Sequence, residues 1–192
     1  MDAIMFLLTL YGAWLLADFV AGVVHWWEDR YLGQMQSFDF ASAIAEDNAN
    51  HHRKPTLMLL FTPWENMRSG AMVGWPIAFV LWCIGCPMLI WLSVFFASFG
   101  NLVHRYAHTP DRQLPDWVAF LQTIGIFSSP DQHRTHHYGP DGIVADRENS
   151  DRAYCPMTDH LNPLLDAMRF WHTAESILSG IGIHPQPYRL DS

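Results

Sequence analysis

The chain has 192 residues, of which 50% are apolar and only 16% are charged, and its formal net charge is −8. This length fits one domain over residues 1–192. The acidic balance argues against a nucleic-acid partner, which favours a basic protein surface. The three cysteines cannot all pair with one another. Cys83 and Cys86 lie inside an apolar run, so we interpret them as small buried hydrophobic residues rather than as a redox or metal-binding pair.

The first apolar segment covers residues 3–27, with Asp18 as its acidic interruption. About twenty apolar residues suffice to span a bilayer, so we predict a transmembrane helix over residues 3–27. A signal peptide is disfavoured because no basic region precedes the segment. A carboxylate inside a membrane helix is costly unless it is paired, so Asp18 is expected to have a buried functional or helix-packing role.

The second apolar segment covers residues 71–102 and is interrupted near its middle by Gly85, Cys86 and Pro87. Each half is about 24 Å long as a helix, which is short for a full span. We therefore predict a tight helical hairpin with helices at about 71–86 and 88–107. A single kinked helix is the alternative. The predicted fold class is all-α, an integral membrane protein with about three transmembrane helices.

Basic residues are distributed unevenly along the chain. None of the eleven Lys and Arg residues precedes Arg30, and none lies between residues 71 and 102. By the positive-inside tendency, the polar loop after the first helix and everything after the hairpin are predicted to be cytoplasmic. This topology places every histidine group described below on the cytoplasmic face.

Residues 110–192 are predicted to form a cytoplasmic helical part. Residues 114–127 are too short to span a membrane, and we predict an interfacial helix with Trp117 at the depth of the lipid headgroups. Residues 139–152 are charged and contain Gly and Pro, which indicates a mobile loop. A last amphipathic helix is expected to begin with Asn162 as its N-cap and Pro163 at its first helical position, and to stop near Gly180.

Histidine distribution is the strongest functional signal in the chain. Eight of the eleven histidines fall into four tight groups: His25; His51 and His52; His104 and His108; His133, His136 and His137. Residues three or four apart share one face of a helix. His104 and His108 can therefore bind one metal ion together, and His133 can do the same with His136 or with His137. The sequence thus predicts a histidine-rich metal site.

Several further polar residues are assigned by their position. Asp29 lies one helical turn after His25 and is a candidate for orienting a ligand imidazole. Asn101 is a candidate for donating a hydrogen bond to a ligand or to bound oxygen, with helix packing as an equal alternative. The remaining histidines have no partner at ligand spacing and are expected to be structural or surface residues: His160, His172 and His184.

Eight imidazoles are more than one metal ion needs, whereas two ions with about four ligands each would use them all. Imidazole sites suit iron, zinc, copper or nickel, so the ligand type alone does not choose the metal. A two-metal site facing a membrane favours iron with O2, because breaking an unactivated C–H bond in a lipid chain needs such an oxidant. Three functions stay open: lipid desaturation, lipid hydroxylation at the same site, and non-enzymatic metal binding, for which ligands along a membrane path would be expected.

Six segments in order carry a resemblance to a known family: DFVAGVVHW (18–26), HHRKPT (51–56), NLVHRYAHT (101–109), HRTHH (133–137), YC (154–155) and LNPL (161–164). Over about residues 11–187 the chain resembles the lipid desaturase family that contains plasmanylethanolamine desaturase and the plant plastid desaturase of phosphatidylglycerol palmitate. Two positions depart from the family pattern. Asn50 stands where a glutamate often precedes the histidine pair, and Gln132 stands where a further histidine often occurs.

The resemblance implies a di-iron centre, which is two iron ions held by all eight grouped histidines. It also implies O2 as co-substrate and an external electron donor that is cytochrome b5-like or ferredoxin-like. The implied substrate is a membrane phospholipid or an ether lipid into which a double bond is inserted. In the ether-lipid branch of the family, that bond converts an alkyl chain into the vinyl ether of a plasmalogen.

Overall fold

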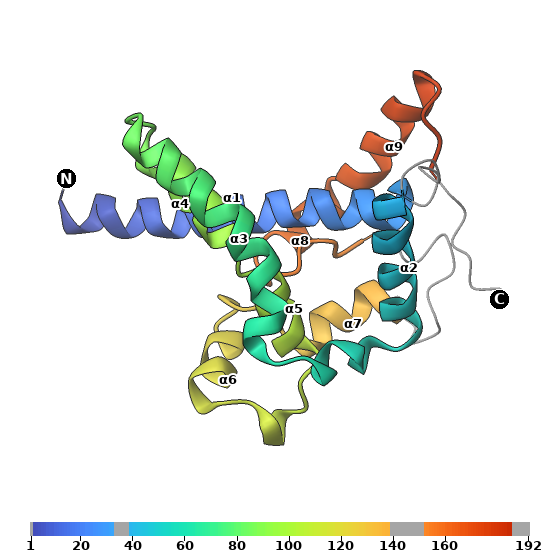
Figure 1. Cartoon of the computed structure of the whole chain (residues 1–192), viewed down its shortest axis with the longest axis horizontal. Coiled ribbons are helices and arrows are strands. Elements are labelled where there is room, and N and C mark those ends of the chain that lie inside the picture. Colours follow the sequence, from blue (N-terminus) through green and yellow to red (C-terminus); the bar gives the residue numbers. More distant parts are fainter. Residues whose placement is uncertain (1, 33–38, 139–151, 186–192) are drawn as a thin grey trace.

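The protein is described by a computed structural model that covers residues 2–32, 39–138 and 152–185 (Figure 1). Within these ranges all regular structure is helical, which confirms the all-α prediction. In chain order the helices are α1 (Ala3–Arg30), α2 (Asp39–Arg53), η2 (Pro55–Leu60), α3 (Pro63–Cys83), α4 (Met88–Ala97), α5 (Gly100–Ala107), η3 (Asp111–Gln113), α6 (Asp116–Thr123), α7 (Pro130–Tyr138), α8 (Asn162–Ala167) and α9 (Phe170–Gly180).

α3 and α4 form the hairpin expected from the sequence, and α4 packs against α1 (Figure 1). The turn between the two helices contains Gly85 with φ of 78°, a left-handed conformation that glycine adopts without a steric penalty. α3 begins at Pro63, eight residues before the predicted start. Thr62 and Glu65 form a capping box there, in which each side chain bonds the backbone N–H of the other residue. The capping box thus starts the helix earlier than predicted, although the side chains of the first helical turns are polar.

In the described ranges, α1 is the one helix that is long and apolar enough by itself to cross a membrane, and α4 with α5 meets the same test only as a pair bent by 50°. The side chains of the first part of α1 point outward, with Ile4 71% and Leu7 63% exposed. Met72 on α3 is 75% exposed. A long apolar helix whose first turns are not covered by protein is suited to contact with lipid. The three predicted spans remain a prediction.

The predicted polar loop after α1 and the predicted return helix over residues 88–107 both need correction. The loop region contains α2, which carries His51 and His52 in its last turn. The return helix is divided into α4 and α5 at Ser98. The Ser98 hydroxyl donates to the Phe95 carbonyl at 2.6 Å and accepts from Trp75 Nε1 at 2.9 Å. Such a local side-chain bond competes with the regular helical ladder.

The predicted last helix is likewise two helices, α8 and α9. Arg169 between them has a left-handed conformation with φ of 52°. Asn162 does not cap α8 as predicted, because its side-chain amide is bonded to the backbone N–H and carbonyl of Cys155 at 2.9 and 2.8 Å. The stop at Gly180 is present. The loop predicted over residues 139–152 lies outside the described residues, apart from residue 152.

A hydrophobic core forms where the C-terminal end of α1 meets α8 and α9: Trp26, Tyr31, Tyr154, Cys155, Leu165 and Trp171. Beside it, Arg30 and Glu175 form a buried ion pair with Nε and Oε1 2.5 Å apart, which joins α9 to α1. Cys155 is buried, but Cys83 is exposed at the end of the α3–α4 hairpin. The prediction of a buried Cys83 was wrong, because no helix among the described residues covers the tip of the hairpin.

Residues 152–158, named here the 152–158 segment, lie in close contact with α1 at Gly22. A Cβ atom added to Gly22 would come within 2.7 Å of Cys155 Sγ and 3.1 Å of Cys155 Cα. The backbone of the segment is therefore held nearer to α1 than any residue with a side chain would permit. Glycine at this position is needed for the close approach.

Gly22→Ala is expected to lower the free energy of unfolding by about 1–3 kcal/mol, because the added methyl group overpacks this contact. Thermal unfolding in detergent, followed by circular dichroism, measures the change. Gly180→Ala is the matched control, since a Cβ there meets no atom within 4 Å. A Gly22→Ala melting curve that overlays the wild-type curve would contradict the packing argument.

Candidate metal centre

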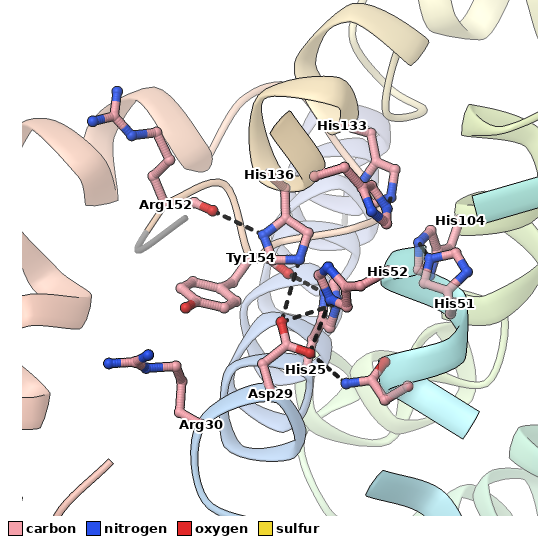
Figure 2. Close-up of polar contacts among 12 residues, drawn as sticks. His25, Asp29, Arg30, His51, His52, His104, His133, His136, Arg152 and Tyr154 are labelled. Carbon is pink, nitrogen blue, oxygen red and sulfur yellow. Dashed lines mark hydrogen bonds and ion pairs between the residues drawn. The ribbon is translucent and has the colours of Figure 1, made fainter. Parts of the chain in front are cut away.

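α1, α2, α5 with the residue that caps its end, and α7 bring together the eight histidines singled out in the sequence, and Asp29 joins them. Figure 2 shows Asp29 with the histidines at positions 25, 51, 52, 104, 133 and 136. Their side-chain atoms form two groups, and within each group the potential ligand atoms lie within 4.8 Å of one another. The five-histidine group contains His51, His104, His108, His133 and His137. The carboxylate group contains His25, Asp29, His52 and His136. The geometry could hold a metal ion in each group.

Helix periodicity explains which histidine joins which group. His104 and His108 are four residues apart and share the five-histidine group, as do His133 and His137. His136, which the sequence left as an alternative partner of His133, belongs to the carboxylate group. Adjacent residues point about 100° apart around a helix. The pairs 51–52 and 136–137 therefore each contribute one imidazole to the five-histidine group and one to the carboxylate group.

The five-histidine group is a close cluster of imidazole Nε2 atoms. The Nε2 atoms of His51, His104 and His108 lie 3.1 to 3.2 Å from one another, and those of His108 and His133 lie 3.0 Å apart. A neutral imidazole nitrogen either carries a proton or presents a lone pair. Among three mutually contacting atoms at least two share the same state and oppose each other. A cation at the centre removes this conflict, because every atom can then present its lone pair to it.

These imidazoles are uncharged and therefore available as ligands. Burial, reinforced by the neighbouring imidazoles, lowers the pKa of His51 to about 2. The same causes hold the pKa of His133 and of His137 well below the ordinary histidine value. Metal ions bind the neutral form of histidine. Protonation near neutral pH consequently does not compete with metal binding in this group.

The carboxylate group offers a more direct test of whether a metal fits. His25 Nδ1 donates to the Tyr154 carbonyl at 3.1 Å, and His136 Nδ1 donates to the Arg152 carbonyl at 3.1 Å. A carbonyl only accepts, so Nδ1 of each ring carries a proton, and in the neutral form of histidine that binds metal ions Nε2 then presents a lone pair. Both Nε2 atoms are buried without a hydrogen bond. Asp29 Oδ2 lies 3.6 Å from Nε2 of His25 and 3.3 Å from Nε2 of His136. Lone pairs facing a carboxylate oxygen repel one another unless a cation lies among them, so the residues fit a metal ion.

Asp29 has a larger part in this group than the orienting role predicted for it, because its carboxylate is among the converging atoms. Its other oxygen, Oδ1, lies 3.1 Å from His52 Nε2 and accepts a hydrogen bond from the Asn48 side chain. Sequence reasoning missed Asn48, although it precedes His52 by four residues on α2 and so lies on the same face. The carbonyl acceptors of residues 152 and 154 left no signal, because every residue has a carbonyl.

The remaining predicted residues lie outside the two groups. Asn101 is exposed on α5 and is not among the converging residues. His160 has a structural role: its Nδ1 lies 2.8 Å from the Tyr11 hydroxyl, and its Nε2 lies 3.2 Å from the Ile124 carbonyl. His172 is exposed on α9. The protein is therefore helical and has a candidate two-metal centre, which is formed by imidazoles and one carboxylate. This centre lies at the end of the apolar helix α1.

Comparison with known proteins agrees with this class. The lipid desaturase domain model matches residues 14–187, and the chain belongs to the lipid desaturase family. It is 29% identical to a probable fatty acid desaturase of Acanthamoeba polyphaga mimivirus, over 90% of this chain and 82% of that protein. It is 25% identical to the plasmanylethanolamine desaturase of Myxococcus xanthus, over 88% of this chain and 62% of that protein. It is 24% identical to the chloroplastic fatty acid desaturase 4 of Arabidopsis thaliana, over 93% of this chain and 53% of that protein.

Of the last two relatives the chain therefore spans less than two thirds. No solved structure matches the chain. Membership of the lipid desaturase family supports an oxidoreductase of lipid metabolism. The apolar α1 helix agrees with a membrane protein.

Asp29→Asn is expected to lower the bound transition metal from about two ions per chain to about one, because the carboxylate group loses its anionic ligand. Anaerobic loading with Fe2+ followed by elemental analysis of the purified protein measures the ratio. Asp47→Asn makes the same chemical change at an exposed position of α2 and should retain the wild-type ratio. An unchanged ratio in Asp29→Asn would exclude the carboxylate as a ligand.

Proposed function

We propose that this chain is an integral membrane lipid desaturase that uses two iron ions and O2 to introduce a double bond into a lipid chain. The single observation that carries the proposal is the convergence of eight imidazoles and the Asp29 carboxylate into two adjoining groups. The groups are neighbours, since the ring centroids of His52 and His137 lie 4.8 Å apart across their boundary. Family membership supplies the lipid substrate class.

Iron bound at these groups would supply the O2-dependent oxidation that an unactivated lipid C–H bond requires. The chain itself holds His51, His133 and His137 neutral by burial. Backbone carbonyls accept from Nδ1 of His25 and of His136, and six of the eight imidazoles are buried. Removal of two hydrogens from the lipid while O2 is reduced to two waters consumes two electrons and two further protons. An external one-electron carrier, cytochrome b5-like or ferredoxin-like, is therefore part of the proposal.

The proposed substrate is the alkyl chain of an ether phospholipid, and the proposed product is its vinyl ether. Relatives named plasmanylethanolamine desaturase, from Myxococcus xanthus and from mouse, support this choice. Desaturation of a fatty acyl chain is the second candidate, which is favoured by the viral and plant relatives named fatty acid desaturases. The same metal groups would serve either substrate.

We further propose that α1, α3 and the α4–α5 pair cross the membrane and that the metal groups lie at its cytoplasmic face. The exposed apolar side chains of α1 and α3 support the spans. In Figure 1, the first part of α1 and the α3–α4 hairpin extend away from the region in which α2, α7 and the C-terminal end of α1 lie. The absence of Lys and Arg from residues 1–29 and 71–102 supports the orientation.

Expression in a host that lacks plasmalogens tests the function. Lipid mass spectrometry should detect acid-labile vinyl ethers formed by loss of two hydrogens from alkyl lipids. New acyl double bonds in their place would select the fatty acyl candidate. Gain of one oxygen without loss of hydrogen would identify a hydroxylase, and unchanged lipids together with bound metal would indicate a non-enzymatic protein.

His136→Ala is expected to abolish product formation and to reduce bound iron, because it removes one of the three imidazoles of the carboxylate group. His172→Ala removes an exposed imidazole on α9 and should retain both properties. Product yield and iron content are measured on the same preparations. Full activity in His136→Ala would refute the assignment of the site.

A further inference from the structure

The 152–158 segment accepts hydrogen bonds from two histidines, and both belong to the carboxylate group. We propose that Asp18 and Thr158 are positioning residues that hold this segment so that its carbonyls orient His25 and His136, and that they thereby support one of the two metal positions selectively. The inference rests on the proposed two-metal function. It assigns a role to a buried acid that is distant from the converging ligand atoms.

Asp18 anchors one end of the segment to α1. Its side chain is fully buried, and its carboxylate accepts from Met157 N at 2.7 Å, from Thr158 N at 3.2 Å and from the Thr158 hydroxyl at 2.7 Å. Asp18 and His25 are seven residues apart, so both lie on the same face of α1. One helix face therefore carries a ligand and also the anchor of the segment that orients this ligand.

The other end of the segment is held by α8. Asn162 is bonded to both backbone groups of Cys155, and Asp166 Oδ1 accepts from Ala153 N at 3.2 Å. Ala153 has φ of 55°, a left-handed conformation that a residue other than glycine keeps only when its surroundings enforce it. The carbonyls on either side of Ala153, those of residues 152 and 154, are the two that accept from the histidines. Their direction is thus determined by contacts at both ends of the segment.

Three members of the five-histidine group have no comparable support in the part of the chain that is described. The Nδ1 atoms of His51, His133 and His137 are buried and have no hydrogen-bond partner there. The two carbonyls of the segment instead serve imidazoles whose ring centroids are only 4.5 Å apart, both in the carboxylate group. A displaced segment would consequently release His25 and His136 while leaving the five converging Nε2 atoms in place.

A hydrogen bond to Nδ1 fixes which nitrogen of a ligand imidazole faces the metal and raises its basicity, and its loss typically weakens metal binding about 10- to 100-fold. Asp18→Asn keeps the size of the side chain but removes the charge and one acceptor oxygen. Thr158→Val keeps the size and removes one donor. Both are therefore expected to weaken the iron position of the carboxylate group and to leave the other unchanged.

Iron titration and Mössbauer spectroscopy of the full chain in detergent test this inference. Wild-type protein should show two iron components, and Asp29→Asn identifies the component that belongs to the carboxylate group. Asp18→Asn and Thr158→Val should lose this same component, with binding weakened about 10- to 100-fold. Thr158→Ser, which retains the hydroxyl donor, should restore it. Ser93→Ala is the control, since it removes a buried hydroxyl that bonds only within α4.

Circular dichroism and elution in detergent establish that each variant is folded, and Thr158→Val decides the matter if Asp18→Asn does not fold. Retention of both components in folded Thr158→Val would overturn the positioning role. Equal loss of both components would overturn its selectivity. Failure of the wild-type protein to bind two iron ions would instead contradict the proposed function itself.

Discussion

The structure depends on a conflict that the protein alone does not resolve: imidazole lone pairs and a carboxylate face one another in a buried space. Asp29 Oδ2 lies 3.3 Å from Nε2 of His136, whose proton is committed to a backbone carbonyl. With neutral imidazoles, such an arrangement is unfavourable unless cations occupy it. α1, α2, α5 and α7 meet at this cluster, whereas the hydrophobic core around Trp26 and Trp171 lies beside it. Metal binding would therefore contribute to folding as well as to chemistry.

The helix α1 joins two different environments. Its first turns expose apolar side chains such as Ile4 and Leu7, whereas its last turns carry His25 and Asp29 into the polar cluster. One continuous helix can thus hold the ligands at a constant depth relative to the apolar surface. A lipid chain lying along that surface would have its reacting carbons at a height determined by helix length and not by a mobile loop.

Much of the site was predictable because histidine spacing reports directly on helix faces, and all eight histidines predicted as ligands belong to the two groups. The partition between the two groups was not predictable, since His133 has possible partners both three and four residues later, and either spacing fits one helix face. α2 was missed because its polar composition concealed a helix, although alanine recurs in it and favours helix formation. The role of the 152–158 segment depends on backbone carbonyls, which carry no residue-specific signal.

The sharing of adjacent histidines between the groups has a mechanical consequence. Residues 51–52 on α2 and 136–137 on α7 each form part of one rigid helical turn, and each turn contributes to both groups. Neither helix can rotate or slide without displacing ligands on both sides at once. The separation between two ions bound in these groups would thereby be controlled by the covalent geometry of the backbone, so a reaction that needs both ions to cooperate would tolerate considerable motion elsewhere in the chain.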